Sequence, residues 1–472
     1  MSVTTQLAVI GGGPGGYAAA FLAADLGMNV TLIDLEKNPG GVCLYRGCIP
    51  SKALLHVAKL INEAEEAKKW GVDFGEPKID IDKLREFKNG VVAKLTGGLG
   101  QLSKQRKINY INGRAEFLSS NKLSVSKIDG TAEEVIFEKA IIATGSVPAK
   151  VPGLSIDSPR VMDSTSALEL NDIPKKLLVI GGGYIGLELS TVYASLGSKV
   201  TVVEMLPGLL PGADRDLVAV LDKRVKSIME NIFTETKVSE LKDNGDSVTV
   251  KLEGPKISEP HMTFDKVLIS VGRKPVTKGF GLENTKVKVT ERGFISVDHT
   301  LKTDDPSIYA IGDIVGNPML AHKAAAEGKV AVEAILGHKV AFEPSAIPAV
   351  VFTDPELAWT GITETEAREK GIKVEVAKFP WGASGRATTL DRNDGMTKLI
   401  IEPETERILG VGMVGVGAGD MIAEGTLAIE MGAVVKDLEL TIHPHPTLSE
   451  TMMAAAEVFY GHATDMYRPK RK

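Results

Sequence analysis

The sequence of 472 residues is poor in cysteine and contains only Cys43 and Cys48. A secreted framework of several disulfides is therefore excluded, and any cysteine chemistry must use this pair. The sequence also lacks an uninterrupted apolar run of about 20 residues, so we expect no membrane span. No charged segment followed by an apolar one opens the chain, so we expect no secretory signal. These absences predict a soluble, cytoplasmic protein.

The sequence has no excess of positive charge, because 55 Lys and Arg residues stand against 61 Asp and Glu residues and give a formal net charge of −6. Such a mildly acidic chain is a poor candidate for binding the phosphates of nucleic acid. A short basic run, residues 468–472, is interpreted as a solvated terminus. The length corresponds to about three domains at roughly 150 residues each.

Glycine is abundant, with 49 residues in 472, which is about 10% where about 7% is usual. Two segments of the sequence repeat after 170 residues, and a third repeats after 127 residues. Residues 9–16 (VIGGGPGG) return as 179–186 (VIGGGYIG), residues 30–34 (VTLID) as 200–204 (VTVVE), and residues 137–145 (FEKAIIATG) as 264–272 (FDKVLISVG). Each copy reads as a strand, a glycine-rich turn, a helix, a second strand and an acid. Two related nucleotide-binding domains are the simplest explanation.

The first glycine motif has the spacing of a dinucleotide-binding loop. Gly11 makes the tight turn, Gly13 lets the backbone approach a pyrophosphate, and Gly16 lets the helix pack closely on the strand. Asp34, 23 residues after Gly11, ends the next strand, where its carboxylate can accept the ribose hydroxyls of an adenosine. The alternative is a structural glycine turn that binds no nucleotide.

The second motif, Gly181, Gly183 and Gly186, has Glu204 at the same spacing. A carboxylate there favours NAD over NADP, because it would repel a 2′-phosphate, and no arginine follows in residues 205–210 to receive one. Two dinucleotides in one chain imply electron transfer between them. In the alternative interpretation, Glu204 only caps a strand in solvent.

The two cysteines lie in residues 40–52 (GGVCLYRGCIPSK). Residues five apart in a regular helix rise about 7.5 Å, which exceeds the limit of about 7 Å for a disulfide. The turn must therefore be distorted to form one, and Gly47 and Pro50 are available for this; such a strained disulfide is easily reduced. A helix starting near Pro50 would place Cys48 at its positive end and favour the thiolate. The alternatives are zinc, for which only His56 is close by, and two inert buried cysteines.

A second candidate for catalysis lies near the C-terminus, where His443 and His445 precede Glu450. An imidazole can exchange a proton with a thiol, and a carboxylate can fix its tautomer. Spacing alone does not decide which histidine acts, and a structural role for the pair remains the alternative.

The remaining pattern suggests how the chain is divided. Residues 323–335 read as a helix, and from about Ile347 strands such as 397–401 alternate with helices such as 421–431. The fold class expected is α/β, with two Rossmann-like three-layer nucleotide-binding domains and an α+β C-terminal domain. The boundaries expected are 1–150, 151–275, a central region 276–346, and 347–472.

The sequence resembles the FAD-dependent pyridine nucleotide-disulfide oxidoreductases, and within them the dihydrolipoamide dehydrogenases. The residues that carry the resemblance are Gly11 to Gly16, residues 41–52, Ala143-Thr144-Gly145, Gly181 to Gly186 with Glu188, Ile311-Gly312-Asp313, residues 318–323 (PMLAHK) and residues 445–450 (HPTLSE). It implies FAD and NAD as cofactors, and no metal.

The resemblance also implies roles for single residues. It assigns FAD contacts to Asp34, Lys52, Ala115, Asp313 and Ala321, and NAD contacts to Glu204, Val238 and Gly272. It makes Cys43 and Cys48 the redox-active disulfide, with Cys43 facing the substrate and Cys48 the flavin. His445 matches the family's catalytic base and Glu450 its partner.

The resemblance further implies a homodimer, in which the C-terminal domain forms the interface and delivers its His-Glu pair to the other subunit's disulfide. The implied reaction is the reoxidation of dihydrolipoyl groups with NAD. The implied partners are lipoyl domains of 2-oxo acid dehydrogenase complexes or the glycine cleavage carrier protein.

The sequence departs from the family pattern at three places. Asp34 stands where glutamate is usual, so its shorter side chain must still reach the ribose. Tyr45-Arg46 replaces Asn-Val between the cysteines, which places a phenol and a cation near the thiols. Pro444 replaces alanine and stiffens the approach to His445.

Three rival functions share this layout. An NADPH-dependent disulfide reductase of the glutathione or trypanothione type should carry arginines for a 2′-phosphate, against which Glu204 argues. A mercuric reductase would need a second cysteine pair. A redox-responsive binding protein would keep FAD without turning over.

Overall fold

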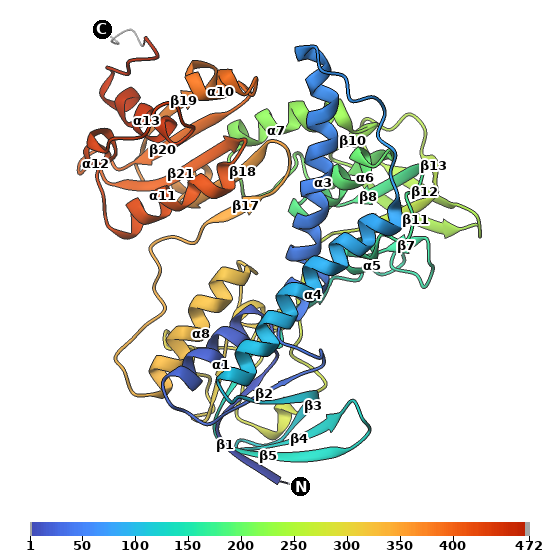
Figure 1. Cartoon of the computed structure of the whole chain (residues 1–472), viewed down its shortest axis with the longest axis vertical. Coiled ribbons are helices and arrows are strands. Elements are labelled where there is room, and N and C mark those ends of the chain that lie inside the picture. The colour runs from blue at the N-terminus through green and yellow to red at the C-terminus, as the bar shows by residue number, and fades with distance from the viewer. Residues whose placement is uncertain (1, 468–472) are drawn as a thin grey trace.

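The computed structural model describes residues 2–467, and its elements gather into three groups (Figure 1). One group holds the N-terminal strands together with helix α8, a second holds the green elements around α6, and the third holds the C-terminal elements in orange and red. Within the described residues, no helix is long and apolar enough to cross a membrane. The basic run at 468–472 lies outside them.

The first group is built on a six-stranded sheet. Its strands are β1 (Ser2–Ile10), β2 (Val30–Asp34), β3 (Asn109–Ser119), β4 (Lys122–Lys127), β5 (Ala132–Ile142) and β16 (Ile308–Ala310). β3, β2, β1, β5 and β16 run parallel in that order, and β4 joins β3 to β5 antiparallel. The last four residues of β1, Leu7 to Ile10, are all buried, which explains their unbroken apolar run.

Two helices cover one face of this sheet. α1 (Pro14–Asp25) and α8 (Ala321–Ile335) pack against each other, and Ala20 of α1 and Ala331 of α8 share a core cluster with Leu7 and Val9 of β1. The opposite face is filled by residues from β3 to β5, such as Phe117. The helix predicted at 323–335 is thus confirmed as part of α8.

The second group repeats the arrangement with a five-stranded sheet. Its strands are, in spatial order, β10 (Asn231–Phe233), β9 (Lys199–Val203), β8 (Lys176–Ile180), β14 (Lys266–Ile269) and β7 (Val161–Met162), all parallel. Its helices are α5 (Ser164–Glu169), α6 (Tyr184–Ser195) and α7 (Arg215–Ile228), and an antiparallel sheet of β11 (Lys237–Asp243), β12 (Val248–Glu253) and β13 (His261–Phe264) adjoins it. β5 and β14 take the same place beside the first strand of each repeat, which explains their similar sequences.

The first two groups are joined by two crossing segments. β6 (Ser146–Pro148) leaves the first group and β15 (Arg273–Pro275) returns to it, and the two pair antiparallel. β16 then completes the edge of the first sheet beside β5. The central segment of the chain therefore belongs in space to the first group, while the exact boundaries 1–150, 151–275, 276–346 and 347–472 stay a prediction.

The third group has an antiparallel sheet covered by helices. The sheet order is β17 (Ala349–Val351), β18 (Glu356–Gly361), β21 (Ile408–Gly415), β20 (Met396–Ile401) and β19 (Glu375–Pro380). The helices are α9 (Glu364–Glu369), α10 (Gly385–Thr389), α11 (Ala418–Glu430), α12 (Val435–Leu440) and α13 (Glu450–Tyr460). The strand expected at 397–401 is β20, and the helix expected at 421–431 is α11.

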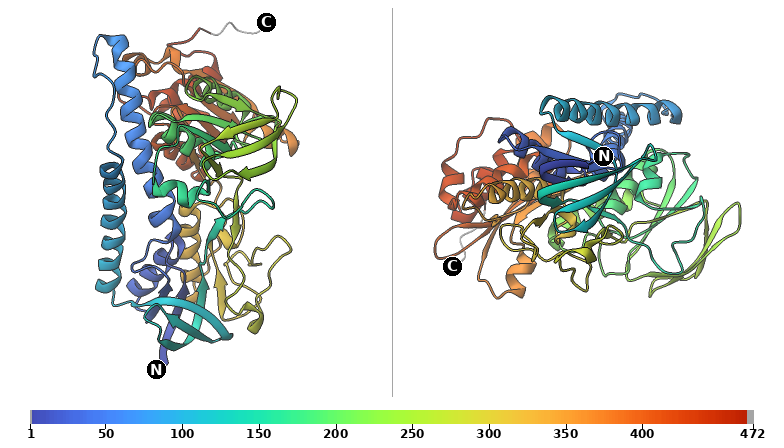
Figure 2. Two further views of the ribbon diagram at one scale, coloured as in Figure 1. Left: turned by 90° about the vertical axis from the view of Figure 1, so that its right-hand side faces the viewer. Right: turned by 90° about the horizontal axis from the view of Figure 1, so that it is seen from below.

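Long helices connect the groups (Figure 2). α2 (Gly41–Arg46) is followed by α3 (Cys48–Glu66), which packs against α6 of the second group and against α4 (Ile81–Gln105). Short 3-10 turns complete the fold at Ala67–Trp70, Leu282–Asn284, Gly312–Ile314 and Trp381–Ala383.

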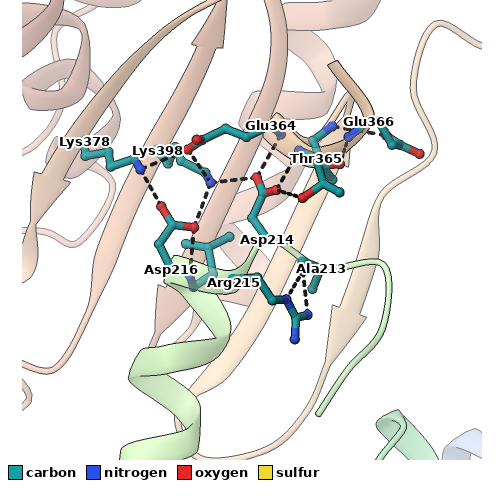
Figure 3. Close-up of polar contacts among 11 residues, drawn as sticks. Ala213, Asp214, Arg215, Asp216, Glu364, Thr365, Glu366, Lys378 and Lys398 are labelled. Carbon is teal, nitrogen blue, oxygen red and sulfur yellow. Dashed lines mark hydrogen bonds and ion pairs between the residues drawn. The ribbon is translucent and has the colours of Figure 1, made fainter. Parts of the chain in front are cut away.

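A buried ion network fixes the third group to the second (Figure 3). Lys398 of β20 is fully buried, and its Nζ lies 2.6 Å from Asp214 Oδ2, 2.9 Å from Asp216 Oδ1 and 2.9 Å from Glu364 Oε1. Lys378 of β19 adds a second cation, 2.7 Å from Asp216 Oδ2. The two lysines occupy the centre of the acidic cluster, so it is a junction between domains and does not present a free metal site.

Candidate functional site

One cavity brings together most of the predicted FAD residues. It is lined by Gly11, Gly13, Asp34, Cys43, Cys48, Lys52, Ala115, Thr144, Gly145, Glu188, Asp313 and Ala321. The wall of this cavity does not include the other predicted nucleotide-binding residues, which are Gly16, Gly181, Gly183, Gly186, Glu204, Val238 and Gly272. It also does not include His445 or Glu450. Of residues 2–467, none beyond Ala324 contributes to its wall.

Close packing explains the glycines of both motifs. A Cβ on Gly16 would lie 1.8 Å from Gly11 O, and a Cβ on Gly186 would lie 2.1 Å from Gly181 O. Gly11 and Gly181 also have φ values of +105° and +109°, which side-chain-bearing residues rarely adopt. The backbone at Gly13 leaves open space, as close approach of a pyrophosphate to the start of α1 requires. These features fit a dinucleotide in each motif.

The acids at the ends of β2 and β9 are held in the same way. Asp34 accepts the Gly12 N–H at 2.5 Å and the Glu36 N–H at 2.8 Å, while Glu204 accepts the Gly182 N–H at 2.7 Å and the Leu206 N–H at 2.8 Å. The shorter side chain of Asp34 therefore reaches the same backbone position as the longer one. Glu204 is buried, so the interpretation as a strand cap in solvent is wrong.

The environment of Asp34 decides its charge. Burial raises the pKa of Asp34, and the Gly12 N–H and the Arg46 guanidinium act against that rise. Tyr110, which packs nearby, has its pKa raised by burial and by the Asp34 charge. The carboxylate therefore depends on its neighbours to remain the anion that accepts ribose hydroxyls.

A break between α2 and α3 brings the two cysteines together. Gly47 breaks the helix with φ −140° and ψ −113°, and a Cβ there would lie 2.9 Å from Val42 O. α3 begins at Cys48, so the expected helix start near Pro50, with Cys48 at its positive end, is confirmed. Cys48 is thus in the first turn of the helix, where the dipole favours a thiolate.

The two thiols differ in acidity. Both cysteines are free, and the Cys43 thiol donates a hydrogen bond to the Cys48 sulfur. This bond lowers the pKa of Cys48 to about 7, with help from the Lys52 charge, while the same bond and burial raise the pKa of Cys43. Both line the cavity, so the alternative of two inert buried cysteines is wrong. His56 is exposed and does not line it, which removes the nearby third ligand that zinc would need.

Lys52 is held by the second group. Its Nζ lies 2.8 Å from Glu188 Oε2 on α6, and the Ser51 hydroxyl donates to the same oxygen at 2.9 Å. The other carboxylate oxygen of Glu188 accepts the Phe352 N–H at 3.1 Å. The Lys52 cation, four residues along α3 from Cys48, is therefore fixed beside the thiols.

Asp313 is positioned by a chain of contacts across the crossing segments. The Ser146 hydroxyl donates to Asp313 Oδ2, and Arg273 Nε donates to the Ser146 hydroxyl at 2.7 Å. Glu327 accepts the neighbouring Gly312 N–H at 2.7 Å and pairs with Lys323 at 2.5 Å. The Asp313 carboxylate and the start of α8 at Ala321 consequently face the same cavity.

The two histidines have separate carboxylate partners. His443 Nε2 lies 2.7 Å from Glu424 Oε1, and only 5% of the His443 side chain is exposed. His445 Nδ1 lies 2.9 Å from Glu450 Oε1, and 78% of its side chain is exposed. Glu450 is itself fixed by the Thr447 N–H at 2.7 Å. His445 is therefore the oriented imidazole with a free Nε2, and His443 is bound within the domain.

Two family models match the chain. A pyridine nucleotide-disulphide oxidoreductase model matches residues 5–328, and its dimerisation-domain model matches residues 347–456. The chain belongs to this family. The fold class, with its nucleotide-binding and dimerisation domains, is thereby confirmed, and FAD and NAD are confirmed as its cofactors.

Curated relatives in this oxidoreductase family match along the whole chain. The dihydrolipoyl dehydrogenase of Vibrio cholerae is 50% identical over 470 residues, which cover 100% of this chain and 98% of that protein. The dihydrolipoyl dehydrogenase of Geobacillus stearothermophilus is 46% identical over 460 residues, covering 98% and 97%.

Solved structures agree with this membership. LpdA from Mycobacterium tuberculosis has a TM-score of 0.89 at 26% identity, with 96% of this chain and 99% of that chain covered. The flavoprotein disulfide reductase RclA from Escherichia coli has a TM-score of 0.84 at 29% identity, with 96% and 99% covered.

The structure of this oxidoreductase adds residues that sequence reasoning missed. Ser146, Arg273 and Glu327 position Asp313, and Ser51 shares Glu188 with Lys52. Among these residues only Arg273 could have been suspected from the sequence, because it directly follows Gly272 at the end of a repeated segment.

Two further residues predicted to contact NAD, Val238 and Gly272, differ in the space around them. Val238 is buried in a core cluster with Ile180 and Val203, and its contact with NAD stays a prediction. Gly272 has φ +118° and open space at its Cβ position.

Proposed function

We propose that this enzyme is a dihydrolipoyl dehydrogenase that passes two electrons from dihydrolipoyl groups to NAD through the Cys43–Cys48 pair and FAD. The observation that carries the proposal is the position of the thiols. Cys43 and Cys48 open into the cavity that holds Asp34, Lys52 and Asp313, and Cys48 has its pKa lowered to about 7 by its contact with Cys43. A thiolate of this acidity is a good leaving group near neutral pH.

The chain's own residues divide the work of thiol exchange. His445, oriented by Glu450, takes a proton from one dihydrolipoyl thiol, and the resulting thiolate attacks Cys43 Sγ. The Cys43–Cys48 bond breaks, and Cys48 leaves as a thiolate next to Lys52. The second substrate thiol then displaces Cys43, so that lipoyl disulfide is released and both cysteines are reduced. Bound FAD supplies the route by which these two electrons reach NAD.

We propose that the base comes from a second subunit. His445 does not line the cavity of its own chain, and none of the described residues after Ala324 does. The exposed large apolar side chains of the same domain include Leu427, Met431, Leu440 and Ile442. We infer that a homodimer formed through this domain buries these side chains and brings His445 to its partner's cysteines, in line with the dimerisation-domain match.

The proposed partners follow from the substrate. We expect lipoyl domains of 2-oxo acid dehydrogenase complexes, or the glycine cleavage carrier protein, to present the dihydrolipoyl group in the cytoplasm. Both carry the dithiol on a flexible arm, and the proposed reaction treats them alike.

The rival reductases are disfavoured by the second nucleotide site. Glu204 is buried and accepts two backbone N–H groups, and residues 205–210 contain no arginine for a 2′-phosphate. The two cysteines are also too few for a mercuric reductase.

The test is a comparison of substrates with the FAD-loaded enzyme. We expect NAD reduction with dihydrolipoamide, and little NADPH oxidation with glutathione disulfide. Cys43→Ser and Cys48→Ser should each abolish the first reaction while retaining FAD. An enzyme that reduces glutathione disulfide faster than it oxidises dihydrolipoamide would overturn the proposal.

A further inference from the structure

The two unusual residues between the cysteines are bound to the loop that follows Asp34. The Tyr45 hydroxyl donates to Asn38 O at 3.1 Å, and the Arg46 guanidinium donates to the Glu36 carboxylate, with which it forms an ion pair. Both acceptors lie in the short loop that follows Asp34. That Tyr45-Arg46 places a phenol and a cation near the thiols stays a prediction, and the structure adds that both side chains are bound to this loop.

Glu36 is a firm anchor for Arg46. Its backbone O accepts the Tyr110 hydroxyl at 2.7 Å and the Asn112 side-chain N–H at 2.8 Å, both from β3. Its own N–H is bound to Asp34 Oδ1 at 2.8 Å. The side chain that receives Arg46 thus starts from a backbone position fixed by two strands, so Arg46 is held in one place.

Arg46 and Glu36 line the same cavity as Asp34. In this fold the acid at the end of the second strand accepts the ribose hydroxyls of the adenosine, and the pyrophosphate lies at the start of the following helix. The Glu36–Arg46 pair therefore forms part of the wall at the adenosine end of the FAD site. Cys43 lies within α2 and Cys48 begins α3 after Gly47, and the cation that acts on both thiols is Lys52.

The charges at this end require a cation. Asp34 and Glu36 are two carboxylates separated by one residue, and the pyrophosphate of FAD adds further negative charge. Arg46 is the cation that pairs with Glu36, and its field also acts against the burial that raises the pKa of Asp34. By contrast, the charged side chains that act on Cys48 are Lys52 and Glu188.

We propose that Arg46, seated on Glu36, is a positioning residue that retains FAD by closing the cavity wall at the adenosine end. Arg46 neutralises Glu36 so that Asp34 alone presents its negative charge to the ribose. Tyr45 supports the same loop through Asn38. This inference rests on FAD occupying the cavity. It does not depend on which dithiol or disulfide is the enzyme's substrate.

The test is the rate at which FAD leaves the holoenzyme after dilution, measured by the return of free flavin fluorescence. We expect Arg46→Gln to release FAD at least tenfold faster than the parent, and Glu36→Gln to release it faster by a smaller factor, because the cation remains but is no longer held. The double variant should release FAD no faster than Arg46→Gln alone, since both changes remove one interaction.

A matched control is available in the same domain. Arg106 pairs with Asp25 at 2.9 Å, and neither residue lines the cavity. Arg106→Gln should leave FAD release unchanged. Equal release rates from Arg46→Gln and Arg106→Gln would overturn the proposal, as would purely additive effects in the double variant.

Two further measurements distinguish a role of Arg46 in FAD retention from a general loss of folding and from an effect on the Cys48 thiol. Arg46→Lys keeps a cation and should restore part of the slow release, which a general loss of folding would not allow. The pH at which the Cys48 thiolate forms in Arg46→Gln should equal that of the parent. A shifted pH would place Arg46 at the thiols and refute its assignment to the adenosine end.

Discussion

Lys52 Nζ lies 2.8 Å from Glu188 Oε2, and this contact joins the helix that carries Cys48 to the helix of the second glycine motif. The two charges act on Cys48 in opposite directions: Lys52 lowers its pKa and Glu188 raises it. One ion pair between two domains thus influences the acidity of the thiol.

The thiolate of Cys48 should respond to both partners. Lys52→Met removes the cation and should move thiolate formation to a pH above about 7, whereas Glu188→Gln removes the opposing anion and should move it lower. The measurement is the pH dependence of the long-wavelength absorbance that a thiolate gives beside bound FAD, in the two-electron-reduced enzyme. Shifts of the same sign in both variants would contradict this account.

The two cysteines should be distinguishable by spectrum. Cys43→Ser leaves the acidic thiol beside the flavin and should retain the long-wavelength band, while Cys48→Ser should lose it. Both variants should bind FAD, which serves as the control for folding. A band in Cys48→Ser and none in Cys43→Ser would reverse the assignment.

The two histidines should differ in their effect on turnover. Removing a positioned base typically lowers the rate by about 10²–10⁴-fold, so His445→Gln should lose at least that much in kcat. His443→Gln should stay within roughly tenfold of the parent, because His443 is bound to Glu424 inside its own domain.

Mixed dimers test whether the site is shared. A Cys43→Ser chain and a His445→Gln chain are each inactive as homodimers, but their heterodimer has one site with both groups intact and should regain activity. Heterodimers, verified by mass, that remain inactive would show that cysteine and histidine act within one chain.

The preference for NAD should follow from Glu204. We expect kcat/KM with NAD to exceed that with NADP by at least tenfold, a difference of about 1.4 kcal/mol. Glu204→Ala combined with Met205→Arg should narrow the ratio, because the repulsion is removed and a cation is supplied. Similar efficiencies with both cofactors in the parent enzyme would refute the role of Glu204.

The Lys398 network should matter for stability. Lys398→Met leaves Asp214, Asp216 and Glu364 without their buried cation and should lower the free energy of unfolding by about 3 kcal/mol or more. Lys378→Met, with a side chain 40% exposed, is the control and should cost less. Urea unfolding of both variants gives the comparison, and equal losses would contradict a special role for Lys398.

The same network also predicts how the stability of the fold depends on pH. Burial acts to raise the pKa of Asp214, but the Lys398 hydrogen bond and the backbone N–H of Glu364 outweigh it, so the pKa is lowered. A carboxyl whose pKa is lower in the folded protein stabilises the fold above its unfolded pKa, and that stability is lost as the pH falls through the folded value. The difference in stability between the parent and Lys398→Met should therefore shrink in acid.

The sequence predicted what is encoded locally. The spacing of Gly11, Gly16 and Asp34 predicts one glycine-rich turn between two strands. Because the same spacing returns from Gly181 to Glu204, two nucleotide-binding domains could be inferred. The contacts made by Lys52 with Glu188, or by Arg273 with Ser146, join residues more than 100 positions apart. No periodicity or spacing carries such pairings, because they depend on how whole domains pack.

Side-chain direction was the other limit. Sequence placed Arg46 between the two cysteines, but it did not reveal that the Arg46 side chain pairs with Glu36 in the loop after Asp34. The sequence likewise did not reveal that the Val238 side chain belongs to the core, and its contact with NAD stays a prediction.

The pairing of β16 with β5 means that the first sheet is completed by a strand that follows the entire second domain in the chain. During synthesis, the β5 edge must wait until residues 308–310 have left the ribosome, by which time the second domain can already have folded between the crossing strands β6 and β15. A fragment ending at residue 150 would keep Asp34 and both cysteines yet lack Asp313 and α8. Such a fragment would expose an unpaired strand edge and bind FAD poorly, so truncation is not a route to an isolated flavin domain of this enzyme.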